Sequence, residues 1–158
     1  MRVVLQRVQK ASVTIENSVY SEINTGMLIL LGIEKEDTKE DVDWLTAKIS
    51  SLRIFSDADG KMNLSIHELD NGEFLVVSQF TLHSSTKKGN RPSFIKAANP
   101  DVAIPLYEYF CKTLHEISLK IVKTGVFAAD QRRHGRAEKA GARLRPVRAE
   151  RGGKNGKG

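Results

Sequence analysis

Apolar and polar residues alternate over much of the first third of the chain, which is the pattern of half-buried β-strands. The alternation is weak over residues 2–8, where Val3, Leu5 and Arg7 fall on one face. It is clearer over residues 11–16. The Arg7 guanidinium either points toward a site or lies along the sheet with its stem packed, and the strand pattern permits both.

The next segments predict a hairpin and a central strand. Asn17-Ser18 is a plausible turn, after which residues 19–23 return as the hairpin partner. A second turn is expected at residues 24–26. Residues 27–33, MLILLGI, are apolar on both faces, so we expect them to form a strand that is covered on both sides.

Two segments carry the three-to-four-residue spacing of amphipathic helices. The first is predicted over residues 38–52, with Thr38 as N-cap and Asp41 three residues further on. The second follows Asn99-Pro100, a pair typical of a helix start. Pro105 interrupts this second pattern, so we expect the helix either to start near Ile104 or to kink in its first turns. The buried stripes are Val42, Leu45, Ile49 and Leu52 in the first helix, and Val102, Leu106, Tyr109, Phe110, Thr113, Leu114 and Ile117 in the second.

Residues 53–68 are expected to form a short strand, a turn and a second strand over residues 62–68. The turn, Ser56 to Gly60, contains two aspartates, as a calcium-binding loop does. However, Met62 takes the position where a calcium-binding loop requires glycine, so calcium binding is not expected. The segment is better explained as a hairpin connection.

Residues 74–82, FLVVSQFTL, are expected to form a central strand that is buried at its start and polar at its end. Phe74 to Val77 form an unbroken apolar run of strand length. Ser78, Gln79 and Thr81 then bring hydroxyl, amide and backbone N–H groups to the edge of a rigid core, as many binding sites do. The alternative is a strand end whose hydroxyl groups cap their own backbone.

A basic loop follows, HSSTKKGNRPSF over residues 83–94. Lys87, Lys88 and Arg91 surround Gly89-Asn90 and suit an anionic ligand such as a phosphate backbone. A solvated surface loop is equally consistent with this composition. Residues 119–124 alternate and predict a last strand.

The net charge of +6 is concentrated in one segment. Residues 131–158 hold 10 Lys and Arg but 2 Asp and Glu, whereas residues 1–130 hold 15 and 17. The pattern predicts one domain over residues 1–130 and a basic, Gly-rich, disordered tail over residues 131–158. Such a composition favours electrostatic association with nucleic acid, although a solvated tail is equally consistent with it. With one cysteine, no apolar run of about 20 residues and no secretory h-region, we expect a cytoplasmic protein.

No familiar catalytic constellation is present in the sequence. The four histidines lack metal-ligand spacing, and there is no nucleophile elbow, phosphate loop or dinucleotide fingerprint. Neither a metal nor another cofactor is therefore expected. The residues by themselves predict a small α+β domain with an anion site beside a strand end.

Several blocks resemble the D-aminoacyl-tRNA deacylase family without a gap over residues 1–130. They are QRV (6–8), ASVTI (11–15), LRIFSDADGKMN (52–63), VVSQFTL (76–82), KKGNRPSF (87–94) and TGVFAAD (124–130). The resemblance implies an α+β fold with a two-sheet, barrel-like β domain and two helices, assembled as a homodimer. It also implies hydrolysis of the ester that joins a D-amino acid, or mischarged glycine, to the terminal ribose of tRNA.

The resemblance further implies how the site works. The ribose hydroxyl of the tRNA assists the reaction, and backbone N–H groups of residues 78–81 surround the carbonyl, with the Phe80 N–H first among them. In a rival scheme Thr81 is the nucleophile, but no activating base is evident. The implied catalytic residues are Ser78, Gln79, Phe80 and Thr81, and those binding substrate or tRNA are Arg7, Leu82, Lys88, Asn90, Arg91, Pro92 and Phe127.

The chain departs from the family pattern after Asp130. The family's second signature, Asn-x-Gly-Pro-Val-Thr, contains a cis peptide bond that enters the partner's pocket and excludes L-aminoacyl groups. This sequence contains no Gly-Pro dipeptide, and Pro146 follows Arg145. A shifted reading frame, an engineered ending and a natural divergence are all compatible with this change. Two functions follow: a deacylase impaired in chiral selection and dimer stability, or an RNA-binding protein of the same fold without turnover.

Overall fold

The computed structural model describes residues 1–87 and 89–126. Four strands form the main sheet in the order β1-β4-β7-β8: β1 (Arg2–Val8), β4 (Gly26–Gly32), β7 (Glu73–Ser78) and β8 (Ile121–Thr124). β1 runs antiparallel to β4, whereas β7 runs parallel to both β4 and β8. The predicted central position of the 27–33 segment is confirmed, because β4 pairs on both sides.

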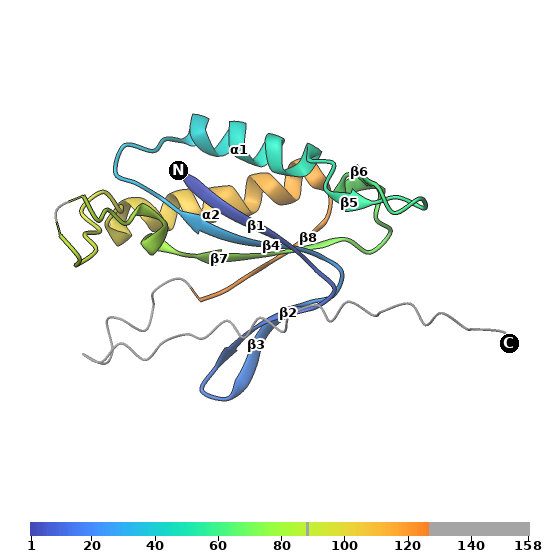
Figure 1. Cartoon of the computed structure of the whole chain (residues 1–158), viewed down its shortest axis with the longest axis horizontal. Helices are drawn as coiled ribbons and strands as arrows, with labels where there is room; N and C mark the ends of the chain where they lie inside the picture. Colours follow the sequence, from blue (N-terminus) through green and yellow to red (C-terminus); the bar gives the residue numbers. More distant parts are fainter. Residues whose placement is uncertain (88, 127–158) are drawn as a thin grey trace, which may run out of the picture.

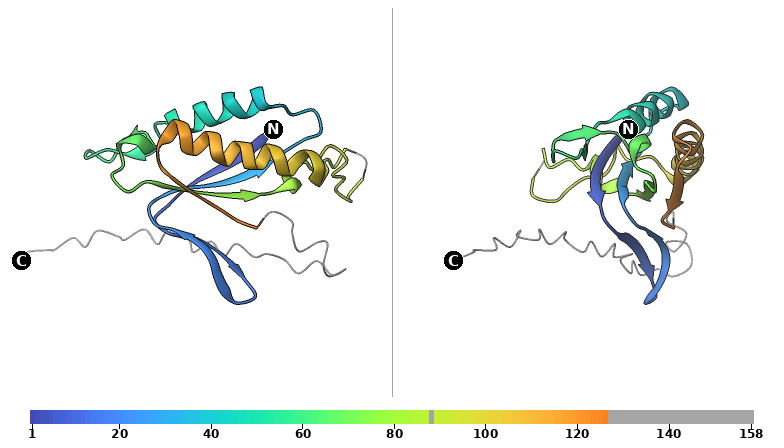
Figure 2. Two further views of the ribbon diagram at one scale, coloured as in Figure 1. Left: turned by 180° about the vertical axis from the view of Figure 1, so that it is seen from behind. Right: turned by 90° about the vertical axis from the view of Figure 1, so that its right-hand side faces the viewer.

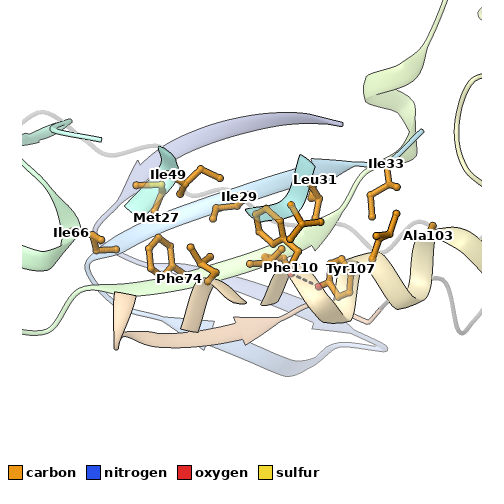
Figure 3. Packing of buried hydrophobic residues seen from close by; sticks show 14 of the residues in the cluster. Met27, Ile29, Leu31, Ile33, Ile49, Ile66, Phe74, Ala103, Tyr107 and Phe110 are labelled. Atoms are coloured by element: carbon orange, nitrogen blue, oxygen red, sulfur yellow. Dashed lines mark hydrogen bonds between the residues drawn. The ribbon is translucent and has the colours of Figure 1, made fainter. Parts of the chain in front are cut away.

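The helices α1 (Lys39–Ser51) and α2 (Pro100–Ser118) cover one face of this sheet (Figure 1). α1 begins as predicted: Thr38 is its N-cap, and the Asp41 carboxylate accepts a hydrogen bond from the Thr38 N–H at 2.7 Å. Hydrogen bonding to Thr38 lowers the pKa of Asp41. The main core lies between helices and sheet, where Met27, Ile29 and Leu31 of β4 meet Phe110 and other side chains of α2 (Figure 3).

The opposite side chains of the sheet pack on a separate hairpin, β2 (Ala11–Ile15) and β3 (Ser18–Ile23). Figure 2 shows this hairpin extending away from the helices. Leu28 and Leu75 from the sheet join Val13 and Ile23 from the hairpin in a second, smaller core. Alternate side chains of the central strands therefore pack into two cores, one on each face of the sheet.

The predicted α+β fold with two amphipathic helices is confirmed, but the sheets do not close into a barrel over the described residues. The main sheet is open there, and β2–β3 and β5–β6 are separate two-stranded ribbons. The hairpin of β5 (Phe55–Ser56) and β6 (Met62–Leu64) confirms the predicted connection. Its turn uses the Asp57 carboxylate internally, as acceptor from the N–H groups of Asp59 and Lys61.

Several predicted boundaries were wrong for local reasons. The first hairpin turns at Glu16-Asn17, both with positive φ, rather than at Asn17-Ser18. The strand predicted over residues 62–68 ends at Leu64, because the Ser65 N–H donates to the Glu68 carboxylate and a 3-10 turn, η1 (Ile66–Glu68), forms. The strand predicted to reach Leu82 ends at Ser78, where a second 3-10 turn, η2 (Phe80–His83), follows one residue later.

The second helix begins at Pro100 with Asn99 as its N-cap, as the Asn99-Pro100 pair predicts. It includes Pro105, so the alternative of a start near Ile104 was wrong. Pro105 lacks the N–H that would bond the Asp101 carbonyl, but both residues are exposed, so water can satisfy that carbonyl. Leu119 ends the helix in the left-handed conformation, and β8 begins at Ile121. No helix in the described residues is long and apolar enough to span a membrane. The predicted tail, residues 131–158, lies outside the described residues.

Candidate active site

The candidate active site is built on the turn that follows β7. The Gln79 N–H donates to the Leu31 carbonyl at 2.8 Å, so the last residue before η2 is still tied to the central strand β4. Gly32 lies beneath this turn: a Cβ there would stand 2.9 Å from the Leu82 Cβ and 3.1 Å from the Gln79 oxygen. The absence of a side chain at Gly32 therefore lets the turn pack directly on the end of β4. We call residues 79–83 the site turn.

Two backbone donors of the site turn are free within the described residues. The Leu82 N–H bonds the Gln79 carbonyl and the Ser84 N–H bonds the Thr81 carbonyl, but no partner is present for the N–H groups of Phe80 and Thr81. The first N–H groups of any helical turn lack an internal acceptor. Here they follow a rigid strand, and the Phe80 residue is 47% exposed. The arrangement can hold a carbonyl oxygen or an oxyanion.

The side chains of the site turn are engaged with close neighbours. The Gln79 amide donates to the Thr81 hydroxyl oxygen. The Phe80 ring meets Phe94 edge to face, with ring centroids 5.3 Å apart. Ser78 is half-buried at the strand end. Within the described residues, no histidine, lysine or carboxylate forms a hydrogen bond with Thr81.

The far end of the site turn is anchored by residues that the sequence analysis did not select. Arg2 donates from Nη1 to the Leu82 carbonyl at 3.0 Å. His83 is 2% exposed and its Nδ1 lies 3.8 Å from a Glu34 carboxylate oxygen. Neither Arg2 nor His83 belongs to a recognisable motif. The pairing of β1 with β4 brings Arg2 close to the turn, and the pairing of β4 with β7 brings Glu34, which follows β4, close to it. The parallel register of β4 and β7 was likewise not evident in the sequence.

β7 is also fixed from behind by α2 and by the residue after β8. The Val76 carbonyl accepts hydrogen bonds from the Tyr107 hydroxyl at 2.7 Å and from the Gly125 N–H at 2.9 Å (Figure 3). Burial raises the pKa of Tyr107 well above its ordinary value, so the hydroxyl stays a neutral donor. These contacts hold the strand two residues before Ser78.

The basic loop extends from the site turn. Ser85 and Ser93 exchange backbone hydrogen bonds of 2.9 Å, which close a loop that contains Lys87, Asn90, Arg91 and Pro92. These four residues are exposed. Lys88, also predicted to bind tRNA, lies outside the described residues, as does Phe127.

Arg7 is not brought to the site turn within a single chain. It pairs with Met27, which pairs with Phe74 at the opposite end of β7 from Ser78. Ser78 lies four residues further along the strand than Phe74, a rise of roughly 13 Å. The Arg7 guanidinium donates to the Ile54 carbonyl at 2.8 Å.

Over the described residues, this fold presents two unpaired backbone N–H groups at the end of a central strand, which is a candidate site for an ester or amide carbonyl. Residues 4–135 match the family described as D-Tyr-tRNA(Tyr) deacylase, and the chain belongs to that family.

Curated relatives and solved structures agree with this assignment. The chain is 61% identical over 132 residues to a D-aminoacyl-tRNA deacylase of Bacteroides thetaiotaomicron, covering 84% of this chain and 87% of the relative. A D-aminoacyl-tRNA deacylase of Flavobacterium johnsoniae is 56% identical over 132 residues, with the same shares covered. A solved structure titled c-Myc DNA Unwinding Element Binding Protein superposes with a TM-score of 0.76 at 38% identity, covering 82% of this chain and 87% of that one. Another, titled as a probable eukaryotic D-amino acid tRNA deacylase, reaches a TM-score of 0.63 at 19% identity, covering 90% and 82%, and supports the fold.

Proposed function

We propose that this protein is a D-aminoacyl-tRNA deacylase, an ester hydrolase that frees tRNA from a D-amino acid or from mischarged glycine. The observation that carries the proposal is the pair of N–H groups at Phe80 and Thr81, which lack partners among the described residues and lie on a turn held to β4 through Gln79. Family membership and 61% identity to a curated deacylase support it. The relatives' activity favours turnover over the alternative of an RNA-binding protein without catalysis.

The reaction follows from the chemistry of an aminoacyl ester. Water adds to the ester carbonyl carbon, and the oxygen that gains negative charge is bound by the Phe80 N–H, with the Thr81 N–H close by. The bond between the carbonyl carbon and the ribose oxygen then breaks, and the proton lost by water goes to that oxygen. One such backbone donor is worth about 10²–10³ in rate. The neighbouring ribose hydroxyl of the tRNA orients the water, so no protein base is required.

The contacts of Thr81 support this RNA-assisted route over a Thr81 nucleophile. A hydroxyl nucleophile needs a base to take its proton. The Thr81 oxygen instead accepts a hydrogen bond from Gln79, and an amide cannot remove a proton. We assign Ser78 and Gln79 to shaping the turn that presents the two N–H groups.

The tRNA is proposed to lie across the site turn and the basic loop. Lys87, Lys88 and Arg91 would contact phosphates, while Asn90 and Pro92 shape the loop and Leu82 lines the turn. Phosphate contacts of this kind orient a nucleic acid without reading its sequence. Phe127, which follows Gly125 by two residues, is proposed to contact the substrate.

We further propose that the protein works as a homodimer in the cytoplasm, where aminoacyl-tRNA is used. β1 and β8 are the outer strands of the main sheet over the described residues, and exposed strand edges favour pairing. Val19, Tyr20 and Ile121 also place apolar side chains at the surface. In such an assembly Arg7, distant from its own site turn, would serve the partner's site. Light scattering after size-exclusion chromatography measures the assembly.

The experiment that tests the function is hydrolysis of D-tyrosyl-tRNA beside L-tyrosyl-tRNA, with the Bacteroides thetaiotaomicron relative run in parallel. We expect this chain to hydrolyse the D-ester, with weaker rejection of the L-ester than its relative. Rejection of an enantiomer needs a rigid group that clashes with it, and these 158 residues contain no Gly-Pro segment to supply one. Binding of tRNA without hydrolysis of either ester would refute the proposed activity.

A further inference from the structure

The site turn ends on a buried histidine whose polar atoms have no hydrogen-bond partner among the described residues. His83 is only 2% exposed, and neither of its buried ring nitrogens has a hydrogen-bond partner among the described residues. Buried polar atoms are nearly always paired, so an orphaned imidazole calls for a physical reason. Packing alone does not supply it, since a leucine or phenylalanine would fill an apolar space without unpaired nitrogens.

A carboxylate stands just beyond hydrogen-bond reach of this ring. The distance from His83 Nδ1 to the nearer Glu34 oxygen is 3.8 Å, within the range of an ion pair but longer than a hydrogen bond. The ring also lies on Gly32, where an added Cβ would stand 3.1 Å from His83 Cδ2. Glu34 follows β4, the strand to which Gln79 is bonded. His83 and Glu34 thus connect the end of the site turn to the segment beneath it.

The charged groups around His83 and Glu34 do not fully neutralise the Glu34 carboxylate. The second Glu34 oxygen lies 3.5 Å from the Met1 ammonium, which also pairs with Asp37. Arg2 is committed to the Leu82 carbonyl. Glu34 also lines a pocket together with Lys35, Glu36, Ile95 and Lys96. The carboxylate is therefore only partly neutralised by the Met1 ammonium, and an imidazolium beside it would be stabilised.

We propose that His83 is a positioning residue for the deacylation reaction. Its imidazolium moves toward Glu34 and fixes the site turn, so that the Phe80 and Thr81 N–H groups point at the ester carbonyl oxygen. This inference rests on the proposed function. A charge-assisted bond is shorter than the present 3.8 Å contact, so protonation draws the ring toward Glu34. The effect acts through the backbone, because His83 is the last residue of η2.

The test compares His83→Asn with the matched control His67→Asn, an exposed histidine on η1. Asparagine retains a polar group near the position of Nδ1 but cannot titrate. Single-turnover rates on D-tyrosyl-tRNA are measured from pH 5.5 to 8.5 and expressed as the ratio of unmodified protein to variant, which cancels the ester's own pH dependence. For His83→Asn we expect the ratio to rise about tenfold as pH falls, the equivalent of one charge-assisted hydrogen bond, with KM unchanged. For His67→Asn the ratio should stay flat.

Glu34→Gln provides a second route, since the Glu34 side chain is 31% exposed and tolerates the amide. Its rate ratio should show the same rise at low pH, and adding His83→Asn should cause no further loss. A flat ratio for Glu34→Gln, or for a folded His83→Asn, would overturn the proposal, as would an effect confined to KM.

A readout without turnover separates this inference from the proposed function. In the unmodified protein the backbone amide resonances of Phe80 and Thr81 should shift with pH along one titration, and the shift should vanish in Glu34→Gln. Amide shifts without any deacylation would refute the proposed function but support the contact between the His83 imidazolium and Glu34. Deacylation with amide resonances whose pH dependence is unchanged by Glu34→Gln would refute that contact alone.

Discussion

Gly32→Ala should impair hydrolysis by displacing the site turn from beneath. The added Cβ would stand 2.9 Å from the Leu82 Cβ, 3.1 Å from the Gln79 oxygen and 3.1 Å from His83 Cδ2. Ordinary contacts begin at 3.4 Å, and all three neighbours belong to the turn. The turn must therefore move outward by roughly half an ångström, because the closely packed interior offers no space to absorb the methyl group.

Gly32→Ala should lower both the stability of the protein and its rate of hydrolysis. Overpacking of a closely packed interior costs about 1–3 kcal/mol in the free energy of unfolding. Since a misplacement of about 1 Å can cost 10²-fold in rate, we expect kcat for D-tyrosyl-tRNA to fall about 10-fold or more, with a small change in KM. Urea denaturation measures the first quantity and single-turnover deacylation the second.

Gly125→Ala is the matched control for this substitution. Its added Cβ would lie at ordinary contact distances of 3.5 and 3.6 Å from the Val77 methyl groups and 3.7 Å from Val13. It therefore adds the same methyl group near β7 without pushing on the site turn, and its rate should stay within about twofold of the unmodified protein. A folded Gly32→Ala protein with an unchanged rate would show that the position of the turn does not control the chemistry.

Three further predictions concern the N–H donors, the loop and the first helix. Phe80→Pro removes the backbone donor and should slow hydrolysis about 10²–10³-fold relative to Phe80→Ala, which keeps it, whereas Thr81→Ala should retain substantial activity; complete loss in a folded Thr81→Ala protein would favour the nucleophile scheme. Arg91→Ala should weaken tRNA binding and lower the slope of log affinity against log salt by about 0.7–0.9, and an unchanged slope in filter-binding titrations would exclude a phosphate contact. Asp41→Asn should destabilise the protein at neutral pH, and the difference should shrink as pH falls through the lowered pKa of Asp41, because the carboxylate stabilises the fold only while it is ionised. A difference in urea midpoints that does not change with pH would contradict the capping role.

The sequence was most informative where one physical requirement acts alone. β4 is apolar on both faces because it is covered on both, and Thr38 with Asp41 caps α1 because the first N–H groups of a helix need acceptors. Errors arose where local hydrogen bonding competes with the apolar period. Glu68 reaches back to the Ser65 N–H and converts a strand pattern into a turn.

The candidate site shows the same division between local pattern and tertiary structure. That Ser78 to Thr81 form a polar strand end was predictable, because the composition changes abruptly at Ser78. That the Phe80 N–H is free was not predictable from periodicity, since it depends on a 3-10 turn that begins one residue after the strand.

The support beneath the site turn depends on pairing between distant segments. Arg2 reaches the turn because β1 is antiparallel to β4, which places Arg2 opposite Gly32, and Glu34 reaches it because β4 pairs in parallel with β7. Gly32, at the end of an apolar strand, showed no sign of a special role until the turn was seen to pack on it. Residues that hold the donors in place thus lie on two segments, β1 and the end of β4 with the residues that follow it. Substitutions at Arg2, Gly32 or Glu34 should therefore alter the rate without touching the substrate. The proposed donors lie in one continuous motif, whereas their exact positions depend on contacts between segments that are distant in the sequence.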